Sequence, residues 1–364
     1  MNHRNLIFSL IFISTIVSVI PISLLATYTR TELLNGFING SYHEDGGYMD
    51  YPESDELPNI QSTYHALKTL SLLESLGSVN TQAVATWINE TQNVDGGFPT
   101  VENGTSNMES TLYAIRSLKL LGYEPKNNIT EWINQCWNTN FGFSNKPNQS
   151  STIWATYNAL NALSLLGENI QSYNSSQWLL SLQNEDEGEN LGAFSADDTY
   201  ELINTFYALS AINLTGKLSD INNTSVINWI TSCQNTDQYQ ANTYGSYRSN
   251  PSGLDYSVIN CFAAIKSFHL LNVSSINLSN VIINWIIDCQ NINSGGFSSI
   301  KDGVSSSVSN SYYAIESLNL INGINSMNSS ITTGLPFNFS IIWIILIVIA
   351  VIVVIGIYIK RRYY

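Results

Sequence analysis

Few residues of this chain have types and spacings that could support catalysis or metal binding. Asp197 and Asp198 are adjacent carboxylates, and such a pair can keep one proton available for general acid catalysis. His43 precedes Glu44 and Asp45, which could ligate Ca²⁺, although a solvated turn is the simpler interpretation of this run. The four histidines of the chain show no metal-site spacing. These residues alone therefore do not establish a catalytic centre.

The cysteines follow a structural pattern rather than a redox pattern. Cys136, Cys233 and Cys289 each stand four residues after a tryptophan, at one repeated position. Equivalent positions on neighbouring helices should lie beyond the ~7 Å Cα separation that a disulfide tolerates. Only Cys233 and Cys261 fall within one helical hairpin and could pair. We expect buried free thiols.

The elements that must position any site come from an internal repeat. Gln92 to Phe98 reads Gln-Asn-Val-Asp-Gly-Gly-Phe, and Gln290 to Phe297 is a second clear copy. Looser copies end at Tyr48, Phe143, Phe194 and Tyr247. Six repeats about 45 to 56 residues apart indicate a repeat architecture. An aromatic residue precedes each turn: Phe37, Trp87, Trp132, Trp178, Trp229 and Trp285.

Each repeat is predicted to be a helical hairpin. Apolar residues at three-to-four spacing predict a first helix, as in residues 81–92, and the Gly-Gly pair ends it. A second helix follows, for which residues 113–122 are the reference copy. Two columns precede it, one aromatic in five repeats and one of small residues, and we interpret both as core packing. The small residues are Thr63, Thr111, Thr156, Thr205, Cys261 and Ser311.

Six hairpins can form an open solenoid or a closed ring. A solenoid requires polar capping repeats, but the first and last repeats here are no more polar than the others. Closure is therefore the preferred prediction.

The Gln-Asn-x-Asp-Gly-Gly-Phe turn followed by a Tyr-Ala-x-x-Ser-Leu helix resembles the repeat of protein prenyltransferase β subunits and squalene/terpene cyclases. The likeness covers residues ~30 to 323, and because its motif recurs six times in phase, it is specific at superfamily level. It implies an all-α fold, a single (α/α)6 toroid of six helical hairpins around a central cavity. The tryptophan-bearing helices would be outer and the Tyr-Ala helices inner. Triterpene cyclases carry two such toroids, so one toroid is more similar to a prenyltransferase β subunit.

The resemblance also implies a catalytic zinc, held by Asp-x-Cys before the fifth inner helix and by a His before the sixth. The corresponding positions here are Ser257, Ile259 and Asn310, none of which offers a thiolate, imidazole or carboxylate. A register shift would bring in Asp255, but one ligand is too few for a closed site. We predict no metal, no cofactor and no identified catalytic residue.

Other enzymatic features of the superfamily are equally incomplete. Class II cyclases use an Asp-x-Asp-Asp acid, whereas Asp197-Asp198 lacks the third carboxylate and is better interpreted as a helix cap. A carbohydrate-active (α/α)6 enzyme would need a carboxylate pair across the cavity. Glu109 and Asp255 belong to repeats two and five, on opposite sides of a ring, too far apart for that role.

The cavity mouth is the candidate binding site. Positions at the start of the inner helices are polar, and the candidate ligand-binding residues are Gln61, Glu109, Ser110, Trp154, Asn204, Asp255, Asn260 and Asn310. Lys68, Arg116 and Lys266 lie one turn deeper, in a column predicted to face neighbouring helices or solvent. On that interpretation they do not form a diphosphate site.

The two ends predict membrane attachment. Residues 1–28 are interpreted as a signal peptide or N-terminal anchor, 29–325 as the toroid and 326–339 as a linker. Residues 340–359 carry no charge, and at ~1.5 Å per residue they would span a ~30 Å hydrocarbon layer. The basic tail 360–364 should be cytoplasmic, which places the toroid outside the cell membrane.

Composition is consistent with that location. The chain has a net charge of −14 and no basic patch, which argues against nucleic acid as a partner. Asn-x-Ser/Thr sequons suggest a glycoprotein, and they include Asn39, Asn89, Asn103, Asn128, Asn148, Asn174, Asn223, Asn272 and Asn328.

Two function classes follow. The first is a membrane-tethered extracytoplasmic module that binds an unknown ligand or protein at the toroid cavity. The alternative is a divergent protein prenyltransferase, of the geranylgeranyl- or farnesyltransferase β type, or a terpene cyclase-like enzyme. Isoprenoid diphosphates and CaaX-type acceptors are cytoplasmic, so the predicted location favours the binding module.

Overall fold

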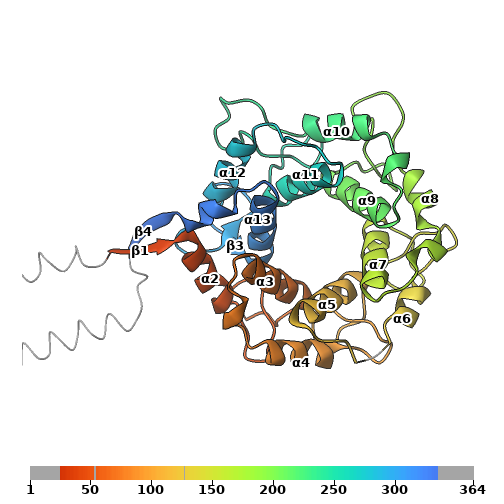
Figure 1. Cartoon of the computed structure of the whole chain (residues 1–364), viewed down its shortest axis with the longest axis horizontal. Coiled ribbons are helices and arrows are strands. Elements are labelled where there is room, and N and C mark those ends of the chain that lie inside the picture. The colour runs from red at the N-terminus through yellow and green to blue at the C-terminus, as the bar shows by residue number, and fades with distance from the viewer. Residues whose placement is uncertain (1–24, 53–54, 127, 335–364) are drawn as a thin grey trace, which may run out of the picture. The chain divides into compact units, whose positions relative to one another are not determined.

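The computed structural model describes residues 25–52, 55–126 and 128–334 of the 364-residue chain. Residues 30–329 form one compact body, in which six inner helices surround a central opening and six outer helices surround them (Figure 1). The inner helices are α3 (Ile60–Leu72), α5 (Met108–Leu121), α7 (Ile153–Leu165), α9 (Leu202–Leu214), α11 (Val258–Leu270) and α13 (Val308–Leu320). The outer helices are α2 (Arg30–Gly40), α4 (Thr81–Thr91), α6 (Thr130–Gln135), α8 (Ser175–Leu180), α10 (Asn223–Ser232) and α12 (Ser279–Asp288).

This arrangement confirms the predicted α/α toroid, with the tryptophan-bearing helices outside. Short 3₁₀ turns join several helices: η2 (Leu76–Ser78), η3 (Ile170–Tyr173), η4 (Leu218–Asp220) and η5 (Ile324–Asn328). A small hairpin pairs β2 (Phe297–Ser298) with β3 (Ser306–Ser307). A separate antiparallel ribbon, which the sequence did not predict, pairs β1 (Leu25–Thr29) with β4 (Ser330–Gly334).

Each Gly-Gly turn is a close-packed joint between consecutive repeats. Gly96 has φ +94°, a left-handed conformation that favours glycine. A Cβ at Gly97 would lie 2.6 Å from the Cβ of Ser106 and 2.8 Å from the Trp132 ring of the next outer helix. The repeated tryptophan therefore covers the glycine turn of the preceding repeat.

The ring closes by the same joint. Gly296, in the last turn, faces Phe37 of α2, so the first outer helix packs on the last repeat. α13 packs on α3 in the same way that consecutive inner helices pack on each other (Figure 1). Asp50 adds two bonds at this seam, because its backbone oxygen accepts from Val308 N and its carboxylate from Ser309 N, at 2.9 Å each.

The small-residue column has a role beyond packing. The Thr111 hydroxyl accepts a hydrogen bond from Phe98 N at 3.0 Å and donates one to Asn107 O at 2.7 Å. It thereby satisfies a buried backbone N–H directly after the Gly-Gly turn. Five repeats accept this bond on a hydroxyl, through Thr63, Thr111, Thr156, Thr205 and Ser311. The fifth repeat has Cys261 at this position.

The cysteine prediction is confirmed. Cys136, Cys233, Cys261 and Cys289 are all free and buried. Burial raises the pKa of the Cys136 and Cys261 thiols to about 12, so they remain protonated and unreactive at neutral pH.

Within the described residues, no helix has both the length and the apolar character needed to cross a membrane. The predicted spans, 340–359 and most of 1–28, lie outside those residues.

Candidate functional site

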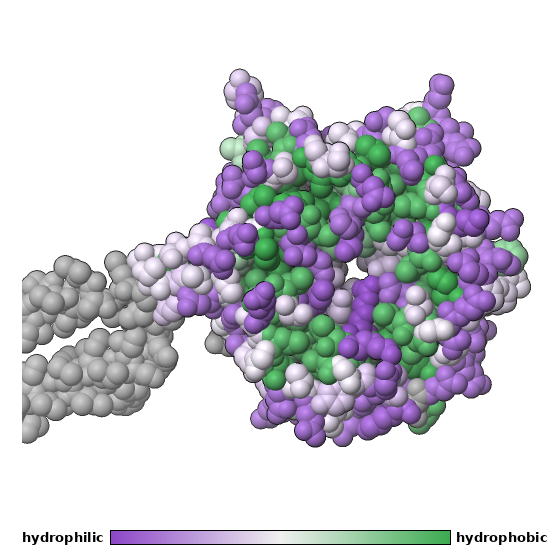
Figure 2. Space-filling view, in the orientation of Figure 1, coloured by the Kyte–Doolittle hydropathy of each residue, from purple (hydrophilic) through white to green (hydrophobic). Residues whose placement is uncertain are grey.

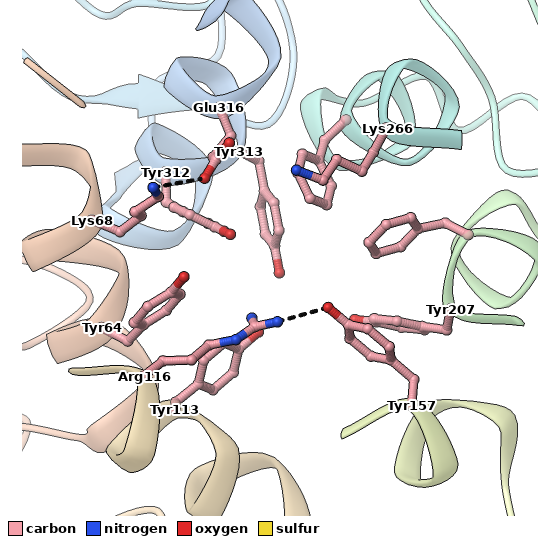
Figure 3. Close-up of a pocket in the computed structure, with 12 residues that line it drawn as sticks. Tyr64, Lys68, Tyr113, Arg116, Tyr157, Tyr207, Lys266, Tyr312, Tyr313 and Glu316 are labelled. Carbon is pink, nitrogen blue, oxygen red and sulfur yellow. Dashed lines mark hydrogen bonds and ion pairs between the residues drawn. The ribbon is translucent and has the colours of Figure 1, made fainter. Parts of the chain in front are cut away.

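A cavity of about 230 Å³ lies at the centre of the toroid, among the inner helices. Figure 2 shows the ring hollowed at this point, and Figure 3 shows the side chains that converge on it. Eight aromatic side chains form most of the wall: Tyr64, Tyr113, Tyr157, Phe206, Tyr207, Phe262, Tyr312 and Tyr313. Four charged side chains complete it: Lys68, Arg116, Lys266 and Glu316.

Helix geometry explains why these residues meet. Residues three or four positions apart share one face of a helix, so Tyr113 and Arg116 of α5 point to the same side. The aligned pairs on α3, α11 and α13 also face the cavity: Tyr64 and Lys68, Phe262 and Lys266, Tyr312 and Glu316. The charged column was predicted to face neighbouring helices or solvent, and that interpretation was wrong. The outcome depends on the rotation of each inner helix about its axis, which the column's own sequence does not fix.

The aromatic rings form a continuous belt. Tyr64 stacks on Tyr113 with ring centroids 5.1 Å apart, and Tyr157 lies 5.3 Å from Tyr207. Tyr313 lies 5.1 Å from Phe262, and its side chain points to the centre (Figure 3). Burial raises the pKa of the Tyr113, Tyr207 and Tyr312 hydroxyls above the usual value, so these three stay protonated. The belt thus combines apolar ring faces with hydrogen-bond donors.

Arg116 is the most constrained cation of the cavity. Its guanidinium carbon lies 5.5 Å from the Tyr64 ring centroid, 6.0 Å from that of Tyr113 and 5.8 Å from that of Tyr157. Its Nη2 donates a hydrogen bond to the Tyr157 hydroxyl at 2.7 Å (Figure 3). Cation–π contact and this bond fix the guanidinium plane inside the belt.

The other charges are less tightly paired. Lys68 Nζ and Glu316 Oε1 are 3.7 Å apart across the seam between α3 and α13. Glu316 is 7% exposed. Among the described residues, no hydrogen bond or ion pair involves the Lys266 side chain. The wall therefore contains three cations and one carboxylate.

Glu109 lies one turn before Tyr113 on α5 and is largely buried. Burial raises the pKa of its carboxyl to about 7, and a hydrogen bond with Trp154 of the neighbouring helix lowers it in part. Its charge influences Tyr113, Tyr207 and Tyr313, which places it electrostatically close to the belt. Glu109 is a carboxyl group that can gain or lose a proton near neutral pH.

His65 lies behind the belt at the seam. Its ring stacks on Tyr312, with centroids 4.2 Å apart, and its Nδ1 is 3.0 Å from the Ser309 hydroxyl. Burial, together with the positive charge of Arg116, lowers the pKa of His65 to about 3. His65 is therefore a neutral structural residue at ordinary pH.

The residues predicted for the cavity mouth lie at or just before the first turns of the inner helices. The structure brings Glu109 to Trp154, and Asn260 Nδ2 donates to the backbone oxygen of Asp255 at 2.7 Å. It does not gather the whole set: Asp255 is exposed in the loop before α11, where its carboxylate accepts from the Ser249 hydroxyl at 2.9 Å. The remaining candidates each stay on their own helix: Gln61, Ser110, Asn204 and Asn310. None of the eight is part of the wall of the 230 Å³ cavity.

The zinc that the superfamily resemblance implies does not fit the residues present. Ser257 is the N-cap of α11 and accepts a hydrogen bond from Asn260 N at 3.3 Å. Ile259 offers no ligand atom, and Asn310 N donates to the capping Ser307 hydroxyl at 3.0 Å. Within the described residues, no group of three or more His, Cys, Asp or Glu could hold a metal ion. Of the three positions, Ser257 serves as a helix cap, and together they offer no thiolate, imidazole or carboxylate.

Two other sequence candidates are accounted for by local structure. The Asp197 carboxylate accepts from Thr199 N at 3.1 Å and from the Ser195 hydroxyl at 3.2 Å, within its own loop. The N-cap of α9 is Glu201, so the interpretation of Asp197-Asp198 as a helix cap was wrong. His43 Nδ1 lies 3.1 Å from the Asp45 carboxylate in an open turn.

Comparison with known proteins supports the architecture. The family model of the prenyltransferase alpha-alpha toroid domain matches residues 7–190, 101–239 and 150–334. Among curated proteins, a search finds no match.

Similar solved structures share the fold at low identity. A type II terpene cyclase from Scytonema is 11% identical with a TM-score of 0.57, covering 82% of this chain and 98% of its own. An alpha-amylase from Clostridium perfringens is 13% identical with a TM-score of 0.53, covering 82% and 97%. Candida albicans protein geranylgeranyltransferase-I is 19% identical with a TM-score of 0.42, covering 82% and 80%.

Proposed function

This chain belongs to the prenyltransferase alpha-alpha toroid domain family, and we propose that it acts as a membrane-tethered ligand-binding module without the zinc chemistry of prenyltransferases. The observation that carries this proposal is the contrast between two levels of the toroid. At the level of the implied zinc, Ser257 and Asn310 contribute to helix capping. One turn or more deeper, aromatic rings and cations surround a cavity of about 230 Å³.

The cavity has the composition of a binding site for a small molecule. Such sites combine apolar and aromatic walls with a few convergent polar groups, and those for drug-sized ligands measure ~300–1,000 Å³. A volume of about 230 Å³ favours a smaller ligand and leaves little room for a farnesyl or geranylgeranyl chain. Arg116 and the tyrosine hydroxyls supply the polar contacts.

The test is recovery of a bound small molecule. Full-length protein purified from its native membranes is analysed by native mass spectrometry, then denatured to release the ligand. Tyr207→Ala removes part of the cavity wall and should abolish the bound mass. Tyr239→Ala makes the same change on a side chain that is 89% exposed, and it should leave the bound mass unaltered. Equal recovery from both variants would contradict a ligand in the cavity.

The location is part of the proposal. The uncharged segment 340–359 and the basic tail 360–364 support a C-terminal anchor with the toroid outside the cell. Protease added to intact cells should cut within 30–329 and spare a tag at the C-terminus. Full protection of the toroid from the protease would place it in the cytoplasm. That location would favour the alternative function, because prenyl substrates are found there.

A second candidate function is a transferase or cyclase, and Glu109 is the observation that favours it. A carboxyl group with a pKa of about 7 beside an aromatic belt can donate a proton at neutral pH. Incubation with farnesyl and geranylgeranyl diphosphate, followed by mass spectrometry, tests this alternative. A product formed by the natural protein and lost in Glu109→Gln would establish the enzyme, whereas no product from either would exclude these substrates.

A further inference from the structure

The central cavity concentrates positive charge in an acidic protein. The chain has 14 Lys and Arg residues and a net charge of −14, yet three of those cations line this one cavity. Glu316 is the single carboxylate in the wall, which leaves two positive charges uncompensated. Aromatic walls have a low dielectric constant, and they strengthen the attraction of a cluster of positive charges for an anion. The cavity is thus an electrostatic site for an anion.

The surroundings of Arg116 give the strongest evidence for an anion site. Among the described residues, no carboxylate lies within ion-pair distance of its guanidinium, and its one hydrogen bond goes to the neutral Tyr157 hydroxyl. A partly buried cation without an anionic partner has lost some of its hydration without compensation, so an arginine held this way is suited to an incoming anion. The guanidinium offers donors in a planar fork that matches a carboxylate or a phosphate.

The two lysines extend this site. Lys266 reaches the cavity from α11 on one side, and Lys68 reaches it from α3 on the other (Figure 3). Lys68 is only loosely held, because its 3.7 Å separation from Glu316 is close to the limit of an ion pair. A ligand with two negative charges would neutralise the two excess positive charges of the cavity wall.

We propose that the ligand of this cavity is a small organic dianion with a planar apolar body, either a dicarboxylate or a phosphate monoester. This proposal rests on the proposed binding function and names its ligand class. In a dicarboxylate, Arg116 binds one carboxylate through two hydrogen bonds, and the second carboxylate lies near Lys266 and Lys68. In a phosphate monoester, Arg116 binds the single phosphate group, and the two lysines compensate its second charge. The tyrosine rings pack against the body of the ligand, and Glu316 disfavours a third negative charge.

Titration calorimetry on the full-length protein in detergent tests the ligand class. Phthalate and phenyl phosphate supply the two dianions, benzoate supplies one charge on the same ring, and benzamide supplies none. Either dianion should bind at least about tenfold more tightly than benzoate, and its affinity should fall as salt is raised. A preference between the two dianions identifies which anionic group the natural ligand carries. Equal binding of benzamide and the dianions would overturn the proposal.

Charge variants separate a binding role from a structural role. Arg116→Gln should weaken dianion binding by about tenfold or more. Glu316→Gln should tighten it, because the variant removes the one competing carboxylate from the wall. A merely structural Glu316 would not produce tighter binding, so this arm remains informative if Arg116→Gln fails to fold. Lys119→Gln is the matched control, since Lys119 is also on α5 but pairs with Glu124 at the surface.

The outcomes distinguish this inference from the proposed function. A neutral or cationic molecule that co-purifies and is lost in Tyr207→Ala would leave the binding function standing and refute the dianion. Unaltered affinity in Glu316→Gln together with unaltered affinity in Arg116→Gln would also refute it. Tight binding of geranylgeranyl diphosphate with no binding of phthalate or phenyl phosphate would refute the small dianion, whereas equal recovery of a bound mass from Tyr207→Ala and Tyr239→Ala would refute the binding function itself.

Discussion

The Gly-Gly turns and the cavity wall are built from the same six repeats, but they use repetition in opposite ways. At the turns, the residues that pack on each other recur around the ring: glycine, an aromatic ring and a small hydroxyl residue. The aligned column that supplies the cavity's charges differs from repeat to repeat and holds Lys68, Arg116, Asn161, Ser210, Lys266 and Glu316, of which the four charged members line the cavity. Residues that must be the same in every repeat build the ring, whereas positions free to differ between repeats give the cavity its charge.

The largest expected effect is in the turns. Gly96→Ala adds a Cβ that would collide with the backbone oxygen of Asn128, in a backbone with φ +94°. Strain and overpacking together should lower the free energy of unfolding by about 3 kcal/mol or more. Gly122→Ala is the control, since its φ is +79° but nothing lies within 4 Å of the added Cβ. Chemical denaturation should show that Gly122→Ala lowers the free energy of unfolding by about 1 kcal/mol. Equal losses in Gly96→Ala and Gly122→Ala would refute close packing as the cause.

A smaller loss should follow removal of one hydroxyl from the repeated column. Thr111→Val preserves shape but leaves the buried N–H of Phe98 without its acceptor. The expected loss in the free energy of unfolding is about 2 kcal/mol. Thr139→Val on the exposed surface should change it little. Both variants should bind the cavity ligand with the affinity of the natural protein. Weaker binding in Thr111→Val would contradict the separation between residues that build the ring and residues that bind the ligand.

The smallest stability effect should come from the cavity side, and it should depend on pH. The folded-state pKa of Glu109 is raised to about 7 from an ordinary 4.5, so the folded protein binds more protons between these values. Its contribution to stability is therefore present at low pH and lost as pH rises through about 4.5 to 7. Glu109→Gln should remove this dependence and gain about 1–2 kcal/mol relative to the natural protein at pH 8.

Thermal denaturation of both proteins at pH 5 and pH 8 checks this prediction. A Glu109→Gln variant with the same pH dependence as the natural protein would show that Glu109 titrates normally. Glu102→Gln serves as the control, because this carboxylate is exposed in the loop before α5.

Much of the ring followed from the sequence, because a repeated Gly-Gly-aromatic turn leaves few alternatives. The order of helices, the outer position of Trp87 and Trp285 and the free cysteines all follow from repetition. The hydrogen bond made by Thr111 did not, since a small residue in a helix reads equally well as packing. Its signal was present in the chemistry: the column holds a hydroxyl in five repeats.

The cavity was less predictable. The cation column could have been assigned to the cavity from the four-residue step between Tyr64 and Lys68, had the aromatic column been taken as the cavity face. The polar mouth residues were read as one site, but the structure leaves most of them on separate helices and none of them in the cavity wall, and the neighbouring Ser257 serves as a helix cap. Single positions of that kind depend on loop geometry that the repeat pattern does not specify.

The most direct test of the central claim, that ligand binding has replaced zinc chemistry, measures zinc in the purified full-length protein. The account predicts no stoichiometric zinc by atomic emission and an unchanged melting temperature with chelator, because Ser257, Ile259 and Asn310 offer no suitable ligand set. Zinc near one equivalent per chain would contradict the account if Asp255→Ala removed that zinc and also lowered the melting temperature. That result would support a metal-dependent enzyme.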